Sequence, residues 1–523
     1  MVKNKPVYSF EEADSKKRML LGGKGAGLSE MTRLKLPVPV GFTITTEVCT
    51  KYYDNNKKLP KDVMPAVMKN IAKMEKKTGK KWNSIKNPLL VSVRSGAATS
   101  MPGMMDTILN LGLNEKTVEG LAEQTKNPRF SWDSYRRFIQ LFGKVVFGVK
   151  DEKFDYILDE VKKKQGIEDD SKLNVESLKT IVLEYKKICE EHTKRKFPDT
   201  PDEQLVLAIE AVFKSWMGER AIVYREKNNI TKDIANGTAV NIVAMVFGNM
   251  GDDSATGVVF TRNGHNGKKE MEGEYLINAQ GEDVVAGVRT GKSIELLKKD
   301  MPKLYKELSI ACKKLEKHFK EPQDIEFTIE QGKFYLLQTR TAKMSAGALV
   351  KTSVDMVREK LIDKNRALTR IPAQQLEALL HRTMDESKIK DFKQLAKGIA
   401  ASPGAASGIV VFDVNKAIEL GNTGKKIILV RKETKPEDVP AFFSSEGILT
   451  SLGGKSSHAA IVSRGMGKPC IVGCPELKID YDKNIGMANG MTIKEGDTIT
   501  IDGSEGTVFI GQIPTIEPKV TKD

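Results

Sequence analysis

The stretch SLGGKSSHAAIVSRGMGKPC, residues 451–470, organises the rest of the chain and contains a single histidine, His458. Two glycines, a lysine and two serines precede this histidine, and the apolar spacing after it predicts a helix. Residues 446–450 predict the end of a buried strand. A strand, a glycine-rich turn and a helix start direct backbone N–H groups toward one point, which suits an anion. An imidazole with an ordinary pKa of about 6.5 is mostly neutral at cellular pH and can act as a nucleophile.

Two interpretations of His458 are open at this point. It is either a carrier histidine that becomes phosphorylated, or a histidine that caps a helix or fills a core. The turn chemistry alone does not separate them, so the other segments of the chain must decide.

Composition describes a soluble, globular chain. Its 523 residues suffice for about three or four domains, and 40% of them are hydrophobic while 29% are charged. The net charge is +15, but the lysines are spread along the whole chain and aromatic residues make up only 6%. We therefore expect no nucleic-acid partner, and attribute the charge to polyphosphate substrates or simple solubility.

The cysteines and the N-terminus indicate a cytoplasmic protein. Five cysteines at scattered positions predict free thiols in a reducing compartment. The N-terminus has no apolar signal core, and no run approaches the roughly 18 residues of a membrane helix. No membrane association is expected.

Changes in periodicity divide the chain into six segments of an α/β and α+β multidomain protein. Strands alternate with helices first, an all-helical insertion follows, and strands then return. Next come a charged helical connector, with expected helices at Leu349–Ile362 and Ala373–Leu380, a strand-rich domain that carries His458, and a polar tail. The expected boundaries are 1–111, 112–197, 198–342, 343–392, 393–512 and 513–523.

A predicted hairpin offers carboxylates on one face. Because side chains two apart in a strand share a face, Asp324 and Glu326 project together. A three-residue loop, Glu330–Gly332, would place Gln338 opposite Asp324, with Arg340 on the same face. Such a set suits Mg²⁺ and a nucleotide phosphate, although a solvated, salt-bridged face is an equally ordinary interpretation. The opposite, apolar face is expected to contain Ile325, Phe327, Tyr335 and Leu337.

Two glycine-rich segments are candidate phosphate loops. Gly22–Gly27 contains Lys24 and precedes a short predicted helix, Leu28–Leu34, but it lacks the spacing of a P-loop. Residues 247–262 predict a turn between strands, in which Thr256 and Gly257 could cover phosphates through a hydroxyl and backbone N–H groups. Ordinary turns explain both segments as well.

Arg94 is a further candidate. It is expected at the end of the apolar strand Leu89–Val93, where ligands tend to bind, and the alternative is a buried ion pair. The other four histidines are expected to be exposed: His192, His265, His318 and His381.

Together these motifs resemble the pyruvate, phosphate dikinases over essentially the whole chain. The resemblance implies an ATP-grasp nucleotide domain with a helical insertion, followed by a swivelling phosphohistidine domain. The motifs that carry it include residues 21–26, 91–97, 100–107, 245–253, 276–287, 324–340, 401–405 and 453–467.

The resemblance also implies a role for each candidate residue, with His458 as the phosphocarrier. Lys24 and Arg94 would hold ATP phosphates, Arg94 would stabilise the transferring group, and Arg340 would bind phosphate. Mg²⁺ and nucleotide ligands would be Asp324, Glu326 and Gln338. The nucleotide would be lined by Gly103, Met105, Thr256 and Gly257.

Two departures from the family pattern stand out. Lys455 and Ser456 replace the usual Met-Thr before Ser-His, which adds a charge beside the carrier and keeps a hydroxyl that regulation could use. The family chain continues into a (β/α)₈ barrel for pyruvate or phosphoenolpyruvate, which needs about 250 residues, and none remain after Asp523.

We therefore expect this chain, as a monomer, to catalyse ATP- and phosphate-dependent phosphorylation of His458, giving AMP and pyrophosphate. Pyruvate would be reached only through a missing or separate barrel. Three alternatives are open: a dikinase that uses water or another acceptor, a phosphocarrier subunit that depends on a partner, and a fragment of a longer gene product.

Overall fold

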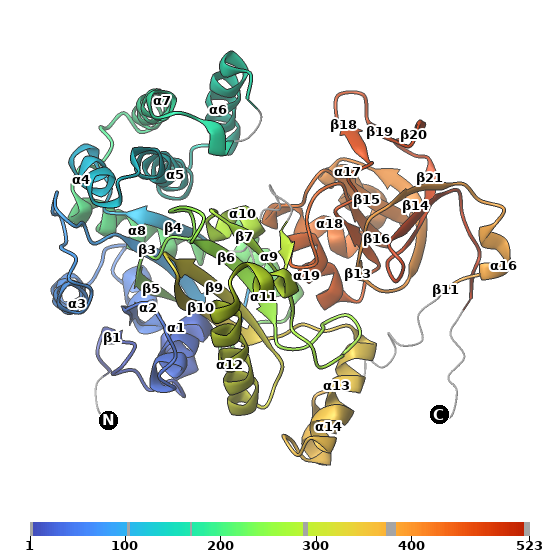
Figure 1. Ribbon diagram of the computed structural model, residues 1–523, viewed down its shortest axis with the longest axis horizontal. Helices are drawn as coiled ribbons and strands as arrows, with labels where there is room; N and C mark the ends of the chain where they lie inside the picture. Colours follow the sequence, from blue (N-terminus) through green and yellow to red (C-terminus); the bar gives the residue numbers. More distant parts are fainter. Residues whose placement is uncertain (1–3, 102–104, 168–169, 286–290, 373–382, 517–523) are drawn as a thin grey trace. The chain divides into compact units, whose positions relative to one another are not determined.

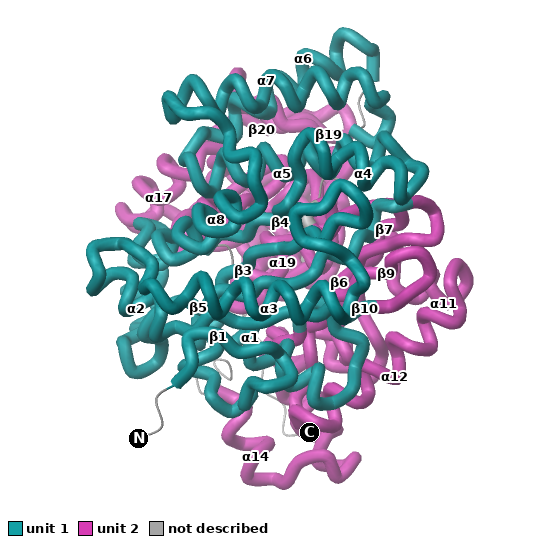
Figure 2. Tube along the Cα trace, turned by 90° about the vertical axis from the view of Figure 1, so that its left-hand side faces the viewer, with its two compact units in different colours: residues 1–250, 335–338 teal, residues 251–334, 339–523 magenta. Residues whose placement is uncertain are grey.

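The computed structural model describes residues 4–101, 105–167, 170–285, 291–372 and 383–516 (Figure 1). The chain forms two compact units: residues 1–250 with 335–338, and residues 251–334 with 339–523 (Figure 2). Both units combine helices with sheets, which agrees with the predicted mixed α/β, multidomain class. The five cysteines are buried and unpaired, as expected of free thiols. None of the described helices is long and apolar enough to cross a membrane.

The first unit is built on an antiparallel five-stranded sheet of order β1-β2-β5-β3-β4. All seven residues of the central strand β5 are buried, and five of them are apolar. The strands are β1 (Val7–Ser9), β2 (Gly41–Ile44), β3 (Val91–Ala97), β4 (Thr107–Leu111) and β5 (Thr238–Ala244).

Helix α1 (Arg18–Arg33) packs against β3 and β5 and contains the first glycine-rich segment. Only Gly22 is non-helical, with φ of 68°, and a Cβ there would lie 1.8 Å from the Gly96 carbonyl oxygen. The predicted helix Leu28–Leu34 was therefore wrong at its start, because the glycines after Gly22 are already helical. Their low helix propensity made them look like a turn.

The segment expected to be helical contains long amphipathic helices that pack against one another. Three of them begin at asparagine caps, Asn114, Asn127 and Asn174, whose side chains accept backbone N–H groups of the first turn. The helices are α4 (Glu115–Thr125), α5 (Pro128–Phe147), α6 (Asp151–Gln165) and α7 (Val175–Thr193).

The second unit contains a five-stranded sheet of order β10-β9-β6-β7-β8, and α12 (Pro302–Phe319) packs against β9. Its strands are β6 (Ala255–Phe260), β7 (Glu272–Ile277), β8 (Lys292–Ser293), β9 (Gln323–Glu330) and β10 (Lys333–Thr341).

The turn between β9 and β10 differs from the prediction. It has two residues, Gln331 and Gly332, both with positive φ, instead of three. Near the turn the apolar face of β10 is consequently shifted by one residue: Phe334 and Leu336 are buried, whereas the expected Tyr335 and Leu337 are only partly buried.

An eight-stranded sheet in the second unit carries the His458 segment. Strands β14 (Ala405–Val411), β15 (Ile427–Arg431), β16 (Gly447–Thr450) and β17 (Cys470–Val472) are parallel neighbours. Carboxyl ends of parallel strands lie at the same edge, so the loops after β15 and β16 emerge side by side. The remaining strands are β12 (Gln394–Lys397), β13 (Ile399–Ser402), β21 (Thr498–Asp502) and β22 (Thr507–Ile510).

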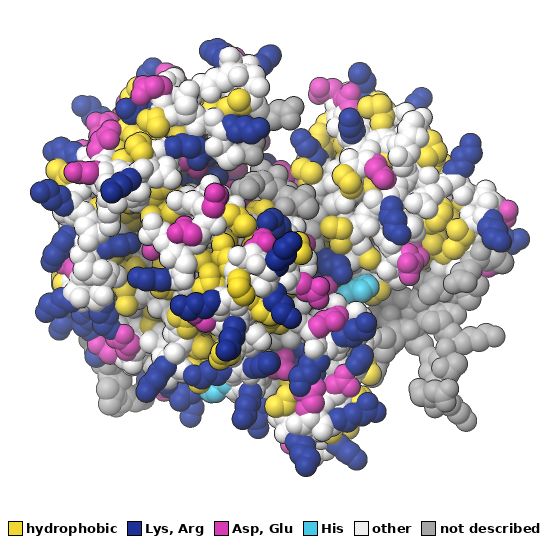
Figure 3. Space-filling model, in the orientation of Figure 1, with side chains coloured by type: hydrophobic (Ala, Val, Ile, Leu, Met, Phe, Trp, Pro, Cys, Tyr) yellow, Lys and Arg dark blue, Asp and Glu magenta, His cyan; other side chains and the backbone are white. Residues whose placement is uncertain are grey.

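Helices α13 (Ala346–Arg358) and α14 (Lys364–Thr369) occupy the expected connector, and the predicted helix Ala373–Leu380 lies outside the described residues. On the face shown in Figure 3, Lys and Arg side chains are interspersed with Asp and Glu over many elements. The positive charge is therefore distributed on this face and does not form one stripe.

Candidate functional site

The His458 turn has the predicted order of strand, turn and helix. Strand β16 ends at Thr450, and α19 (His458–Met466) begins with the histidine itself. Ser457 caps the helix, because its side chain accepts a hydrogen bond from the Ala460 N–H. Gly453, with φ of 102°, allows the turn to reverse direction. His458 thus lies at the positive end of a helix dipole, where an anion is stabilised.

The two ring nitrogens of His458 have different surroundings. Nδ1 lies 3.4 Å from the Thr434 hydroxyl, in the loop after β15, while Nε2 is buried and has no hydrogen-bond partner among the described residues. The ring of Phe442 packs edge-on at 6.1 Å. In the tautomer in which Nδ1 carries the proton and donates a hydrogen bond to the Thr434 hydroxyl, Nε2 keeps its lone pair. The arrangement therefore presents Nε2 as the nucleophilic atom.

Burial lowers the pKa of His458 to about 4; Glu437 opposes this shift and Lys343 adds to it. A neutral imidazole is consequently maintained at pH 7, as a nucleophile requires. A histidine that only capped a helix would not need an unpaired, buried ring nitrogen.

We expect the Cε1–Hε1 NMR signal of His458 to stay unchanged between pH 8 and about pH 5, because the lowered pKa keeps the ring neutral there. The His458→Asn variant would assign the signal. In the chain unfolded in urea, the same signal should titrate near pH 6.5. A midpoint near 6.5 in the folded protein would contradict this description of the site.

Asp324 and Arg340 form a second polar group in the same unit. Arg340 donates through Nε to Asp324 Oδ2 at 2.7 Å, so these two predicted site residues are in contact. Asp324 is 3% exposed, and its other oxygen, Oδ1, is buried without a hydrogen-bond partner in the part of the chain that the structure describes. Burial raises the pKa of this carboxyl, although Arg340 acts in the opposite direction.

These carboxylates fit a cation. The orphaned Oδ1 of Asp324 is an acceptor that a metal ion would satisfy, and Glu326 is two residues along the same strand. The described residues contain no cluster of three or more His, Cys, Asp or Glu side chains that could hold a metal alone. Nucleotide phosphates would therefore have to complete the ligand set.

In the first unit, Arg94 belongs to a row of polar residues that crosses four strands. Thr43 pairs with Asn241, Asn241 with Arg94, and Arg94 with Thr107. Directly opposed residues share a face. The expectation that Arg94 ends its strand was wrong, because β3 continues to Ala97.

Helix α1 covers this same face. A Cβ on Gly25 would lie 2.7 Å from the polar oxygens of both Thr43 and Asn241, and a Cβ on Gly96 would lie 3.3 Å from the Lys24 Cβ. Gly96 is two residues after Arg94, so its Cβ direction is the same. The sequence-predicted Lys24 and Arg94 therefore lie on one face of the first sheet.

The second glycine-rich segment contains the predicted turn between β5 and β6, but the prediction misplaced Thr256 and Gly257. Thr256 and Gly257 lie inside β6, which pairs on both sides with β7 and β9, and not in a turn. The Thr256 hydroxyl is buried and donates to the Phe327 carbonyl oxygen at 3.2 Å. A Cβ on Gly257 would lie 2.6 Å from the Phe327 ring, so this glycine serves packing. In this arrangement neither residue is available to cover a phosphate.

The remaining residues predicted for the site, and the other histidines, lie as follows. Met105 is partly buried just before β4, Gly103 lies outside the described residues, and Gln338 is buried in the part of β10 that belongs to the first unit. His192 and His318 are exposed as expected, His265 is only partly exposed, and His381 is not among the described residues.

Sequence reasoning missed two residues beside the carrier. Thr434 comes from a different loop, and no spacing in the sequence links it to His458. Lys343 follows Arg340 by three residues, and its Nζ lies 3.1 Å from the point that a Cβ of Gly465 in α19 would occupy. A search for cations next to the predicted hairpin would have found Lys343, whereas Thr434 required the fold.

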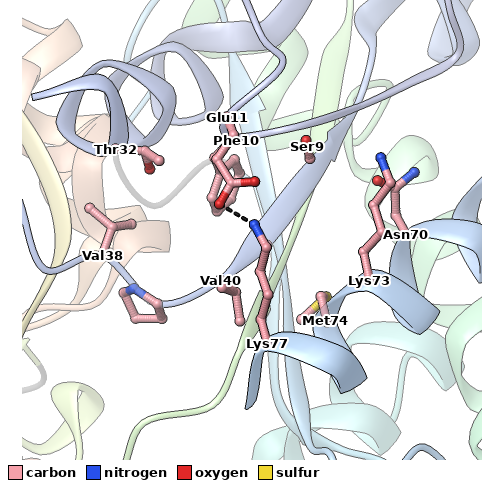
Figure 4. Close-up of a pocket in the computed structure, with 12 residues that line it drawn as sticks. Ser9, Phe10, Glu11, Thr32, Val38, Val40, Asn70, Lys73, Met74 and Lys77 are labelled. Atoms are coloured by element: carbon pink, nitrogen blue, oxygen red, sulfur yellow. Dashed lines mark hydrogen bonds and ion pairs between the residues drawn. The ribbon is translucent and has the colours of Figure 1, made fainter. Parts of the chain in front are cut away.

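A pocket in the first unit lies elsewhere. Segments around β1, β2 and α3 (Val63–Thr78) line it, and Lys77 points across it to an ion pair with Glu11 (Figure 4). None of the residues predicted for the site lines this pocket. The pocket therefore adds nothing to the candidate chemistry.

Comparison with known families gives two matches. Residues 18–58, 55–314 and 302–361 match the model described as "Pyruvate phosphate dikinase, AMP/ATP-binding domain". Residues 423–506, which include His458, match "PEP-utilising enzyme, mobile domain".

Several curated proteins are similar over nearly the whole chain. Pyruvate, phosphate dikinase of Entamoeba histolytica is 53% identical over 98% of this chain and 58% of its own length. The Clostridium symbiosum protein of the same name is 49% identical, covering 98% and 59%. Pyruvate, phosphate dikinase 1, chloroplastic, of Arabidopsis thaliana is 45% identical, covering 100% and 54%. The chain spans somewhat more than half the length of these relatives.

Proposed function

The chain belongs to the pyruvate phosphate dikinase family, and we propose that it phosphorylates its own His458 from ATP and phosphate, releasing AMP and pyrophosphate. The observation that carries this proposal is the neutral, buried and unpaired Nε2 of His458, with Nδ1 beside the Thr434 hydroxyl. Members of this family use ATP as substrate and Mg²⁺ in catalysis, which agrees with the polar groups of both units.

In the proposed reaction, the Nε2 lone pair attacks the β-phosphorus of ATP and the bond to the AMP oxygen breaks. Phosphate then takes the terminal phosphoryl group from the histidine-bound diphosphate, which leaves phosphohistidine and pyrophosphate. Phosphoryl transfer depends mainly on positioning and charge neutralisation. We assign these tasks to Lys24, Arg94 and Arg340. Asp324, Glu326 and Gln338 would hold Mg²⁺, which supplies further charge neutralisation on the phosphates when bound.

We propose a corresponding division of the chain. An ATP-grasp fold would comprise 1–111 and 198–342, interrupted by a helical insertion at 112–197. A connector, 343–392, would lead to a swivelling phosphohistidine domain, 393–512, and a tail, 513–523. The match of residues 423–506 to a mobile domain supports this assignment.

Pyruvate is the proposed final acceptor, because the names of the relatives contain it. Its site would be a (β/α)₈ barrel, in the same polypeptide or in a partner. Rotation of the His458 domain would carry the phosphoryl group to that site.

The decisive experiment is labelling of the wild-type protein. With Mg²⁺, phosphate and ATP labelled at the β-position, we expect one acid-labile label per chain, located on the His458 peptide by mass spectrometry. Label in the γ-position should appear in pyrophosphate. Acid-stable label, or label on another peptide, would contradict the proposal.

Replacement of Thr434 by valine should slow this labelling about tenfold, because the hydrogen bond that orients the ring is lost. Thr434→Ser keeps the hydroxyl and should label within about twofold of wild type. Rapid-quench measurement at saturating ATP separates this effect from nucleotide binding. Equal rates for valine and serine variants would show that Thr434 does not position the carrier.

A further inference from the structure

Two glutamates of β7, Glu272 and Glu274, bind the loop that precedes His458. The Lys455 backbone N–H donates to Glu274 Oε1 at 3.1 Å, and the Ser456 hydroxyl lies 3.4 Å from Glu274 Oε2. The Lys455 ammonium group donates to Glu272 Oε1, also at 3.1 Å. The loop before His458 is thus bound, through its backbone and its side chains, to β7. This strand lies in the part of the chain that matches the AMP/ATP-binding domain.

Residues on both the loop and β7 allow this contact. A Cβ on Gly454 would lie 2.1 Å from the Glu274 carboxylate, so only glycine allows this approach. The second oxygen of Glu272 accepts the Gly264 N–H at 2.9 Å, which fixes the carboxylate toward the loop. The Glu272 side chain is 11% exposed, and that of Lys455 36%. The lysine therefore reaches a preorganised acceptor and is not simply solvated.

We propose that the Lys455–Glu272 ion pair is a reversible latch, which docks the carrier loop against β7 while His458 is loaded. This inference rests on the proposed function, because it assumes that His458 is loaded from the nucleotide. A partly exposed pair is weak enough to open and is screened by salt. Such a contact can position the loop without trapping the domain.

A zero-length cross-link tests the contact without any turnover. Carbodiimide joins an amine to a nearby carboxylate, so the wild-type protein should yield a linked pair of peptides that contain Lys455 and Glu272. Lys455→Arg keeps the charge but cannot form this amide, and should give none. Absence of the Lys455–Glu272 link from the wild-type protein would overturn the latch.

Labelling kinetics test its role. Glu272→Gln and Lys455→Met should slow His458 labelling about fivefold, and Lys455→Glu at least tenfold, while Lys455→Arg stays within twofold of wild type. Between 50 and 500 mM NaCl the wild-type rate should fall, and the rate of Lys455→Met should change by less than half as much.

The outcomes separate the two proposals. Wild-type protein that takes up no label would overturn the proposed function, and the loading role with it. Normal wild-type labelling that is insensitive to every substitution at Lys455 would overturn the latch alone.

Discussion

Replacing Arg340 with methionine should slow phosphorylation of His458 about a thousandfold, because the proposed function assigns to Arg340 the neutralisation of charge on the transferring group. The loss also affects the neighbouring carboxylate. Asp324 is buried and accepts from Arg340 at 2.7 Å, so without this partner its negative charge loses the cation that is hydrogen-bonded to it. The measurement is a single-turnover labelling rate at saturating ATP, which excludes a simple loss of nucleotide affinity.

Arg340→Lys is the matched control. It keeps the charge but loses the planar fork that binds carboxylate and phosphate together, so we expect an intermediate loss of about tenfold. Arg340 lowers the pKa of Asp324 against the effect of burial. Its removal should therefore raise that pKa further and move the acidic limb of the pH–rate profile to higher pH. A methionine variant within tenfold of wild type would rule out a direct role for Arg340.

The hairpin shows how far alternation along a strand can predict a site. Period-two spacing predicted Asp324 beside Arg340, and the hydrogen bond between their side chains shows that the two are in contact. The turn was predicted one residue too long, since the sequence Glu-Gln-Gly accommodates two-residue and three-residue turns. Positive φ at Gln331 and Gly332 decides between them, and this conformation depends on local backbone energies that a pattern does not contain.

The His458 loop shows that local elements can be predicted from the sequence, whereas a contact between distant segments cannot. Its own strand, turn and helix follow from sequence, because glycines and a serine cap mark the boundaries. Thr434 does not, since it reaches His458 only because β15 and β16 are adjacent parallel strands. The reason for a glycine could not be predicted either, because Gly257 lies inside a sheet, where the Phe327 ring packs closely against it, and not in a turn. Close packing and turns both select glycine, and only the fold distinguishes them.

No sequence pattern indicates a role for Arg262, yet its replacement should have the largest effect on the free energy of unfolding. Its side chain is fully buried after β6 and forms ion pairs with Glu316 of α12 and Glu359 at the end of α13 at 2.8 and 2.7 Å. Arg262→Met should lower the free energy of unfolding by about 3–5 kcal/mol, because Glu316 keeps the cost of burial without its ion-pair partner and Glu359 keeps only Lys269. Urea unfolding measures the loss, and faster hydrogen exchange in α12 and α13 should locate it.

Two comparisons distinguish loss of the ion pairs from loss of packing. Arg262→Met combined with Glu316→Met removes the unpaired charge and should recover part of the stability, which a pure packing defect would not.

The second comparison is the stability difference between wild type and Arg262→Met as a function of pH. Although burial opposes it, Arg262 and Lys269 hold the pKa of Glu359 below its ordinary value. The stabilisation from the Glu359 carboxylate is therefore fully present above the pKa that this group has in the unfolded chain. It is lost as the pH falls through the lower pKa that the group has in the folded protein. The difference between wild type and Arg262→Met should accordingly shrink below about pH 4, and a constant difference down to pH 3 would contradict an electrostatic origin.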